Sequence, residues 1–402
     1  MLVAGTMGFT CGLPLLLTIT VLQAWMKEEK VDLSLIGLMA LVGLPYTVKF
    51  LWSPFLDRFT PPFLGRRRGW LLIAQAGLVA AIIGLGLTDP AGAPFLTALA
   101  AVLVTFFSAS QDIVVDAYRR EDLADEELGL GSSFYVNGYR LGMLLASGGG
   151  LILADHFSFR TVYFLMAAAQ AAGLITTWLA PEPPAPQDAP RTLREAVFEP
   201  FLEFFARPGA WWILVFVLAY KLGDQMASAM TTPFYLDIGF SKTEIGAVVK
   251  LFGFWATVAG GFLGGLWMLK LGINRALWVF GLMQAAALLG FVALARIGPS
   301  VTALAVVIGL ENLGIGLGTT AYVAFMASLT DKRFTATQYA LLSSLMGVPR
   351  VLASAPTGVM AKHLGWEGYF IACALIALSG LPLLLKFAPW SGAKSGPSSP
   401  RT

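Results

Sequence analysis

The chain has 402 residues, of which 57% are hydrophobic and only 13% are charged, and its mean hydropathy is +0.72. Charged residues make up about a quarter of an ordinary globular domain, so this composition excludes a soluble multidomain protein. The formal net charge of +3 gives no support to nucleic-acid binding. The two cysteines and the two histidines lie far apart in the sequence, so we expect no disulfide framework, metal site or cofactor.

Apolar runs of roughly 20 residues, the length that crosses the hydrocarbon core of a bilayer, follow one another along the chain. They predict an all-α integral membrane protein with about twelve spans. The spans are expected near residues 2–25, 34–56, 70–88, 94–117, 130–154, 160–180, 210–236, 243–269, 274–295, 300–328, 336–361 and 366–388. The first run begins almost at Met1, which suggests a trimmed or misassigned start.

The longest polar interruption is residues 181–208. Its Pro-rich beginning predicts a linker, and "TLREAVFEPFLEFF" (192–205) is compatible with a short amphipathic helix on the membrane surface. The tail at 389–402 is rich in Ser, Gly and Pro and is expected to be disordered. If the N-terminus lies inside, the cytoplasmic loops hold thirteen Lys and Arg residues against six in the outer loops, so we expect both termini in the cytoplasm.

The sequence also repeats itself across the linker. Residues 137–164 align with residues 346–370 over a small gap, and Arg140 then falls on Arg350. The offset is close to half of the chain, which is the pattern of two parallel six-helix halves in the major facilitator architecture. The predicted parts are a first half at 1–180, the linker at 181–208, a second half at 209–388 and the tail at 389–402.

Charges inside the predicted spans avoid every third span. The third, sixth, ninth and twelfth spans have no charge in their interiors, and a charge that faces lipid is costly. In the major facilitator fold every third helix faces lipid while the others line the cavity or the interface between halves, so this distribution fits that fold. The buried charges of the remaining spans are Lys49, Asp112, Asp116, Arg140, Lys221, Asp224, Lys250, Glu311 and Arg350.

The loop between the second and third spans reads "LDRFTPPFLGRRRG" (56–69) and resembles the signature loop of major facilitators. In that loop an aspartate and arginines latch the cytoplasmic ends of helices in one conformation. The resemblance makes Asp57, Arg58, Gly65 and Arg66 candidate latch residues, and we expect Asp116 to serve the arginines of this loop. The alternative is a plain cluster of positive charge on the cytoplasmic side.

Longer stretches resemble one family, the AmpG-type muropeptide permeases. They include "GLPLLLT" and "LQAW" in the first span, "FSASQDIVVDAYR" in the fourth, "YKLGD" in the seventh, "ENLGIGLGT" in the tenth and "FTATQYALLSSL" in the eleventh. The resemblance covers nearly the whole chain. It implies a proton-driven symporter, a monomer of the bacterial inner membrane, that imports N-acetylglucosaminyl-anhydro-N-acetylmuramyl peptides from periplasm to cytoplasm for peptidoglycan recycling.

One departure from the family falls before the fifth span. The family commonly has two acidic residues followed by Arg and Gly, whereas this chain has Glu126-Glu127-Leu128-Gly129. One arginine of the cytoplasmic latch is therefore expected to be missing.

Two buried acids are the candidates for proton coupling. At ~1.5 Å per residue Asp112 lies roughly 10 Å inside the cytoplasmic boundary, within reach of Lys49 or Arg140. Asp112 is either half of a static ion pair or a proton carrier whose acidity changes with access to water and cations. Glu311, near the middle of the tenth span, has the same two roles open to it, with Lys250 or Arg350 as a static partner.

A muropeptide is large, polar and acidic, so its recognition needs cations, hydrogen-bonding groups and aromatic faces. The candidate substrate-binding residues are Arg140, Lys221, Asp224, Arg350, Gln111, Gln225, Tyr139 and Tyr220. Lys221 and Asp224 are three residues apart and are expected to neutralise each other on one helix face. A major facilitator for another anionic solute, such as acetyl-CoA, is the nearest alternative, and a receptor that does not transport also stays open. No His-Asp acyltransferase motif is present, so we expect no enzyme.

Overall fold

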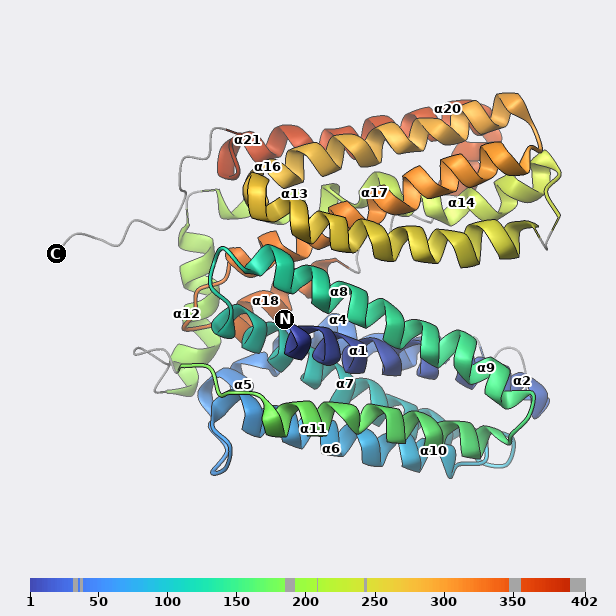
Figure 1. Ribbon diagram of the computed structural model, residues 1–402. Helices are drawn as coiled ribbons and strands as arrows, with labels where there is room; N and C mark the ends of the chain where they lie inside the picture. The colour runs from blue at the N-terminus through green and yellow to red at the C-terminus, as the bar shows by residue number, and fades with distance from the viewer. Residues whose placement is uncertain are drawn as a thin grey trace. The chain divides into compact units, whose positions relative to one another are not determined.

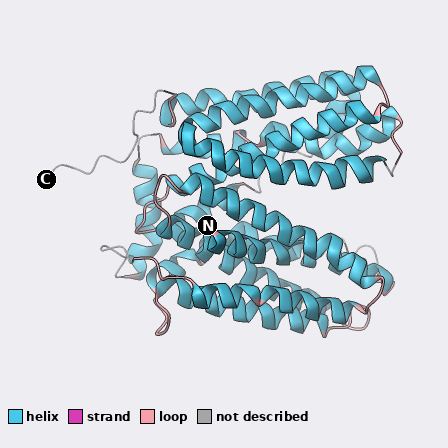
Figure 2. Ribbon diagram, in the orientation of Figure 1, coloured by secondary structure: helices cyan, strands magenta, loops and turns pink. Residues whose placement is uncertain are grey.

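The structure is a computed structural model of the chain and describes residues 1–31, 35–36, 39–184, 192–207, 209–241, 244–346 and 356–390. Across these residues the backbone forms helices and connecting loops without a strand (Figures 1 and 2). The predictions for Arg350 and for most of the tail fall outside the described residues.

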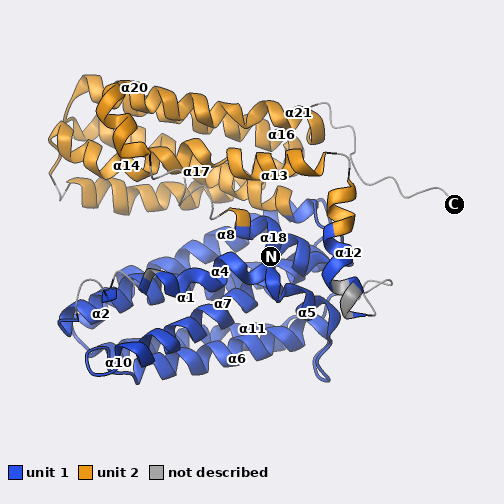
Figure 3. Ribbon diagram, turned by 180° about the vertical axis from the view of Figure 1, so that it is seen from behind, with its two compact units in different colours: residues 1–201, 327–344 blue, residues 202–326, 345–402 orange. Residues whose placement is uncertain are grey.

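The chain divides into two compact units (Figure 3). The first unit is Met1–Phe201 together with Ala327–Ser344, and the second is Leu202–Met326 together with Leu345–Thr402. The segment Ala327–Ser344 comes from the second half of the sequence but groups with the first unit. The predicted boundaries of the two six-helix halves stay a prediction.

The helices of the first unit begin with a long run that is interrupted once. In chain order they are α1 (Leu2–Leu16), the π-turn η1 (Leu17–Val21), α2 (Leu22–Glu28), η2 (Met39–Gly43), α4 (Leu44–Val48), η3 (Lys49–Leu51), α5 (Ser53–Arg58), α6 (Arg66–Gly86), α7 (Pro94–Asp122), α8 (Leu128–Leu144), the π-turn η4 (Leu145–Gly149), α9 (Gly150–Ala154), α10 (Phe159–Gln170), α11 (Ala172–Leu179) and α18 (Thr335–Leu345). The linker helix α12 (Leu193–Ala206) passes from the first unit into the second.

Proline and small residues shape these helices. Pro14 lies inside α1 and has no N–H to donate, and the π-turn η1 begins three residues later, at Leu17. Pro94 stands at the first position of α7, where its missing N–H costs nothing. A Cβ on Gly8 would lie 2.1 Å from the carbonyl oxygen of Tyr135, so α1 and α8 pack backbone against backbone.

The second unit contains α13 (Ala210–Ala219), α14 (Leu222–Ile238), the π-helical η5 (Ile245–Phe252), α16 (Gly253–Ile297), α17 (Val301–Ser328), α20 (Thr357–Ser379), η6 (Leu381–Leu383) and α21 (Leu384–Phe387). Both α16 and α20 contain a turn at a glycine with positive φ, at Gly272 (φ 74°) and Gly365 (φ 66°). Each of these long elements is therefore two helices joined by a tight glycine turn.

The core of the second unit is aromatic. The rings of Phe234, Phe291 and Phe370 pack together, with centroid distances of 4.7 Å for Phe234–Phe370 and 4.8 Å for Phe291–Phe370. Close glycine contacts recur here, because a Cβ on Gly260 of α16 would lie 2.2 Å from the carbonyl oxygen of Leu313 on α17. Both units thus combine bulky apolar side chains with glycine-mediated contacts between backbones.

Among the described residues, 8 helical stretches are long and apolar enough to cross a membrane. They include Leu2–Glu28, Pro94–Asp122 and Ile245–Ile297, the last of which covers the predicted eighth and ninth spans on either side of Gly272. The predicted second span is shorter and broken into α4, η3 and α5. Large apolar side chains are exposed to the surroundings, for example Phe95 (83%) and Leu179 (77%), as lipid-facing positions require.

Candidate functional site

A buried set of charged and polar side chains, here called the Arg67 cluster, joins α5, α6, α7 and α18. It comprises Asp57, Arg66, Arg67, Glu121 and Thr337. The guanidinium of Arg67 donates from Nη2 to Asp57 Oδ1 (2.8 Å) and Glu121 Oε1 (2.7 Å), and from Nε to Glu121 Oε2 (2.9 Å). Arg66 Nη2 donates to Glu121 Oε1 at 3.0 Å. Two arginines and two carboxylates therefore balance one another away from solvent, as a buried ion-pair network must.

Asp57 also holds the first turn of α18. Its Oδ2 accepts hydrogen bonds from the backbone N–H of Thr337 (2.9 Å) and from the Thr337 hydroxyl (2.8 Å). The amide N of Ala336 approaches Oδ1 at 3.4 Å. An anion at a helix N-terminus satisfies orphan N–H groups and complements the helix dipole. Through Asp57, a segment from the second half of the sequence is bound to the cluster.

The structure corrects the predicted partner of the arginines. The Asp116 carboxylate is bound by Arg119, one turn further along α7, with Nη2–Oδ1 at 3.2 Å. Glu121 takes the place beside Arg66 and Arg67, because it lies roughly 7.5 Å closer to the end of α7 and has a longer side chain. Arg58, a further predicted latch residue, lies over the ring of Phe59 at 5.4 Å.

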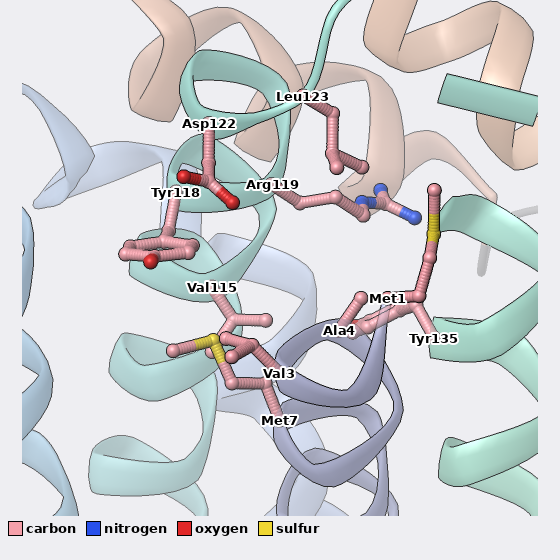
Figure 4. A pocket seen from close by; sticks show the side chains of 10 residues that line it. All are labelled: Met1, Val3, Ala4, Met7, Val115, Tyr118, Arg119, Asp122, Leu123 and Tyr135. Carbon is pink, nitrogen blue, oxygen red and sulfur yellow. The ribbon is translucent and has the colours of Figure 1, made fainter. Parts of the chain in front are cut away.

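Arg119 makes a second connection between α7 and α18. Its guanidinium donates to the Tyr339 hydroxyl (3.0 Å) and the Ser132 hydroxyl (3.3 Å) and lies 4.4 Å from the centre of the Tyr135 ring. Figure 4 shows Arg119 beside a cavity that is also lined by Tyr135, Asp122 and Met1. The cavity measures about 10 Å³, which accommodates one water molecule and excludes a sugar or peptide group.

Asp112 lies in α7, more than one turn before Arg119, and is buried. Lys49 and Asp116 are the charged groups that act on it, and the Cys11 thiol is within hydrogen-bonding reach. Of the two partners predicted for Asp112, the structure thus places Lys49 close by. The Asp112 Oδ1 atom is buried and has no hydrogen-bond partner among the residues that the structure describes. An unsatisfied carboxylate oxygen is costly, so this atom is suited to a proton or a bound water.

Gln111 is fully buried and bonded inside the first unit. Its Nε2 donates to Thr10 Oγ1 (3.2 Å) and Cys11 Sγ (3.3 Å), and its Oε1 accepts from Gln170 Nε2 (2.9 Å). These bonds join α1, α7 and α10. In this structure the Gln111 amide is therefore occupied by packing contacts between helices.

Two further predicted residues lie on α8. Arg140 and Tyr139 are half-buried, and the Tyr139 ring lies 6.2 Å from the Tyr135 ring. Asp112 and Tyr46 act electrostatically on Tyr139, so this ring stands in the same region of the first unit as the buried acid.

The second unit holds its own polar cluster. Lys221 Nζ donates to Asp224 Oδ2 at 3.2 Å, which confirms the predicted pairing of these residues on one helix face. Gln284 Nε2 on α16 donates to the same oxygen at 2.8 Å. Glu311 on α17 is under the influence of Asp224 and Lys221, and its Oε2 accepts from Asn312 Nδ2 at 2.8 Å. Among the described residues, the cation that acts on Glu311 is Lys221. Of the two predicted partners, Lys250 is exposed and Arg350 lies outside the described residues.

The remaining predicted binding residues fall into different environments. Tyr220 is buried, stacks on Tyr322 with centroids 5.4 Å apart, and donates from its hydroxyl to the Leu277 carbonyl (3.2 Å). Gln225 is half-buried on α14, beside Asp224.

The residues that the sequence reasoning missed are Arg67, Glu121 and Thr337 of the Arg67 cluster. Only Arg67 carried a local signal, since it belongs to the basic run after Gly65.

Comparisons with known proteins agree with this architecture. The family model of the Major Facilitator Superfamily matches residues 3–354 and, in a second match, residues 220–401. Among solved structures, that of the proton:xylose symporter XylE superposes with a TM-score of 0.71 at 12% identity, covering 96% of this chain and 95% of XylE. At this level of identity the likeness concerns the fold alone.

Sequence relatives are much closer. The anhydromuropeptide permease of Escherichia coli K12 is 44% identical over 381 residues, which cover 94% of this chain and 78% of the relative. A putative transporter named AmpG 4 from Rickettsia felis is 33% identical over 94% of each chain. An uncharacterised protein of Haemophilus influenzae is 42% identical, covering 97% of this chain and 94% of its own. This chain is thus a multi-pass membrane protein of the major facilitator superfamily, and within that superfamily it belongs to the AmpG family of permeases.

Proposed function

We propose that this protein is a proton-coupled symporter that imports anhydromuropeptides from the periplasm to the cytoplasm by alternating access. The observation that carries the proposal is its 44% identity, over 94% of the chain, to a protein named anhydromuropeptide permease. We further propose that it works as a monomer in the bacterial inner membrane, with both termini in the cytoplasm. The Arg67 cluster then lies on the cytoplasmic side, where the loops carry more basic residues than the outer loops do.

Recognition of an acidic glycopeptide is supported by cations held within the helices. Lys221 is buried in the second unit and Arg140 is half-buried in the first. Peptide carboxylates pair well with such groups, most strongly with a guanidinium, which binds both oxygens of a carboxylate. Arg350, which aligns with Arg140 in the sequence repeat, is proposed to serve the same purpose in the second half.

Proton coupling requires an acid whose ionised form is incompletely stabilised. Asp112 fits this requirement because Oδ1 is buried without a hydrogen-bond partner among the described residues. Glu311 fits as well, because it shares Lys221 with Asp224 and its Oε2 accepts a hydrogen bond from a neutral amide. Asp224 fits less well, since Lys221 and Gln284 both donate to its Oδ2. Each unit therefore offers one candidate carrier, Asp112 or Glu311.

The substrate is tested by counterflow in proteoliposomes that contain the purified protein. Radiolabelled N-acetylglucosaminyl-anhydro-N-acetylmuramyl tripeptide is expected to exchange, whereas acetyl-CoA is not. Failure of the muropeptide to exchange while acetyl-CoA does so would overturn the substrate assignment and favour the alternative solute.

Coupling is tested with an imposed proton gradient, acid on the side that corresponds to the periplasm. In the wild type we expect the muropeptide to accumulate above equilibrium. Accumulation is lost in Asp112→Asn if Asp112 carries the proton, and in Glu311→Gln if Glu311 does. Counterflow of the muropeptide persists in both variants. Asp155→Asn and Glu28→Gln remove exposed carboxylates and serve as matched controls. If the gradient drives no accumulation in the wild type, the symport proposal fails. Normal accumulation in both test variants would instead exclude these two acids as carriers.

A further inference from the structure

The peptide that follows α11 is bound to the beginning of α6. Glu182 lies in this peptide, at the start of the linker, and its carboxylate accepts two backbone hydrogen bonds at the N-terminus of α6. The Arg67 N–H donates to Oε1 at 2.8 Å, and the Arg68 N–H donates to Oε2 at 2.9 Å. Glu182 thus caps a helix that begins more than a hundred residues earlier in the chain. The capping is favourable because the first N–H groups of a helix have no partner within it.

Gly65 makes this contact possible. Its φ is +84°, a conformation that side chains other than glycine rarely adopt. A Cβ at this position would lie 2.7 Å from Glu182 Cδ, so any larger residue would displace the carboxylate. The glycine therefore serves both the turn and the approach of Glu182.

Other bonds fix the same junction. The Arg68 guanidinium donates to the carbonyls of Thr177 (2.9 Å) and Trp178 (2.6 Å) at the C-terminal end of α11. The Tyr118 hydroxyl of α7 donates to the Pro181 carbonyl at 2.7 Å. Together they attach the end of α11 to α6 and α7, so the start of the linker is fixed against these two helices.

The linker is bound again at its far end. Gln338, next to Thr337 on α18, donates from Nε2 to the Pro200 carbonyl of α12 at 3.2 Å. Gln338 is itself held, because its Oε1 accepts the Asp331 N–H at 2.7 Å. The linker thus contacts both helices that meet at Asp57: α6 through Glu182 and α18 through Pro200.

We propose that Glu182 is a positioning residue for the Arg67 cluster and makes the linker part of the contact that holds α18. The residue whose N–H binds Glu182 is Arg67 itself, and its guanidinium bridges Asp57 and Glu121. Releasing Glu182 frees the first turn of α6, so Arg67 loses its fixed approach to Asp57. Asp57 in turn holds α18. By this route, a displacement of Glu182 at the start of the linker weakens the hydrogen bonds between Asp57 and α18.

The test measures how often α18 leaves Asp57. Ala336 is fully buried, so a cysteine introduced by Ala336→Cys reacts with a maleimide only when the first turn of α18 separates. The native Cys11 and Cys373 are fully buried and report any general loosening of the fold. The full-length protein in detergent, without substrate, is labelled over time. The matched control is Glu126→Gln, which removes an exposed carboxylate.

With Glu182→Gln, we expect labelling at position 336 to accelerate roughly tenfold or more, the factor that follows from losing a hydrogen bond to a charged group. Labelling of Cys11 and Cys373 stays unchanged, as does labelling at position 336 in the Glu126→Gln control. Unchanged labelling at position 336 in Glu182→Gln, or equal acceleration at all three cysteines, would overturn the proposal.

A second comparison isolates the Gly65–Glu182 contact. Gly65→Ala is made in the wild type and in Glu182→Ala, and the strain of the positive φ cancels because it is present in both. We expect Gly65→Ala to accelerate labelling strongly in the wild type and several-fold less once the side chain at 182 is shortened. Equal effects in the two backgrounds would refute the contact.

The role of Glu182 is argued from contacts in the structure. It rests on the proposed transport function only where the release of α18 is taken as a step of the transport cycle. If wild-type protein fails to exchange muropeptide while Glu182→Gln still accelerates labelling, the transport proposal fails and the role of Glu182 stands. If exchange is normal and labelling does not respond, the role of Glu182 fails alone.

Discussion

The bond between Thr337 and Asp57 allows the strength of the α18 contact to be measured directly. Thr337→Val replaces a hydroxyl by a methyl group in a side chain of nearly the same shape, at a position that is 1% exposed. It removes the 2.8 Å bond from Thr337 Oγ1 to Asp57 Oδ2 and leaves the 2.9 Å bond from the Thr337 N–H in place. The substitution therefore deletes one bond without opening a cavity.

The magnitude follows from the charge and burial of the acceptor. A hydrogen bond to a charged group contributes about 1.5–3 kcal/mol, and the fully buried Asp57 carboxylate leaves little room for water to replace it. Since 1.4 kcal/mol is a factor of ten, an α18 contact weakened by this amount opens roughly 10 to 150 times more often. Thr330→Val is the matched control, because the Thr330 hydroxyl donates to the neutral carbonyl of Ala327 three residues earlier, at 2.8 Å. Its expected cost is about 0.5–1.5 kcal/mol.

A double-mutant cycle separates the bond from everything else that the substitutions do. The free energy of unfolding is measured by SDS titration, with tryptophan fluorescence as the signal, for the wild type, Thr337→Val, Asp57→Ala and the double variant. We expect a coupling energy of about 1.5–3 kcal/mol between the two positions. A value below about 0.5 kcal/mol would show that the hydroxyl contributes little and would refute the reasoning, whatever the stability of the single variants.

Three further outcomes follow from packing and buried polar groups. Gly8→Ala is expected to lower the thermal stability of the protein in detergent sharply, because its Cβ would lie 2.1 Å from a carbonyl oxygen of α8. The matched control Gly5→Ala is tolerated, because its Cβ meets no atom closer than 3.7 Å. Gln170→Leu leaves the buried Oε1 of Gln111 without its 2.9 Å donor and should cost about 1–3 kcal/mol in the same SDS titration. Tyr322→Phe removes a 2.6 Å bond to a carbonyl on α13 and should cost about 1–2 kcal/mol there, while a change below 0.3 kcal/mol would argue against that bond.

The fold was predictable because a helix that crosses a bilayer needs a long apolar run, and both the composition and the length of such runs can be read from the sequence. Apolar runs near residues 94–117 and 300–328 correspond to α7 and α17. The Lys221–Asp224 pair was predictable for a related reason, since residues three apart on one helix are neighbours whatever the rest of the fold does. Contacts between near neighbours on one helix, and burial in the bilayer, can both be predicted from a single sequence.

The contacts between distant segments were not predictable in the same way. Glu121 follows two arginines and precedes several other acidic residues, and nothing in the run 121–127 distinguishes the acid that faces α6. Glu182 stands in a Pro-rich stretch that reads as a linker, yet its carboxylate caps α6. Lys250 was one of the two expected partners of Glu311, but it is exposed, and the described cation that acts on Glu311 is Lys221 from a different helix. Such pairings depend on which helices become neighbours.

The sequence repeat gives the two units the same glycine turn, but the residues around the turn differ. Gly65 and Gly272 occupy matching turns, in "LGRRRG" and "LGINRA", and both have positive φ, 84° and 74°. The turn is therefore common to both units, but its surroundings differ: a Cβ at Gly65 would strike Glu182, whereas the described residues leave open space around Gly272. Arg275, which follows the second turn, donates to the neutral Trp390 carbonyl at 3.1 Å. The repeat supplies the turn twice, and in the first copy the acids Asp57, Glu121 and Glu182 add a charged contact that binds α18.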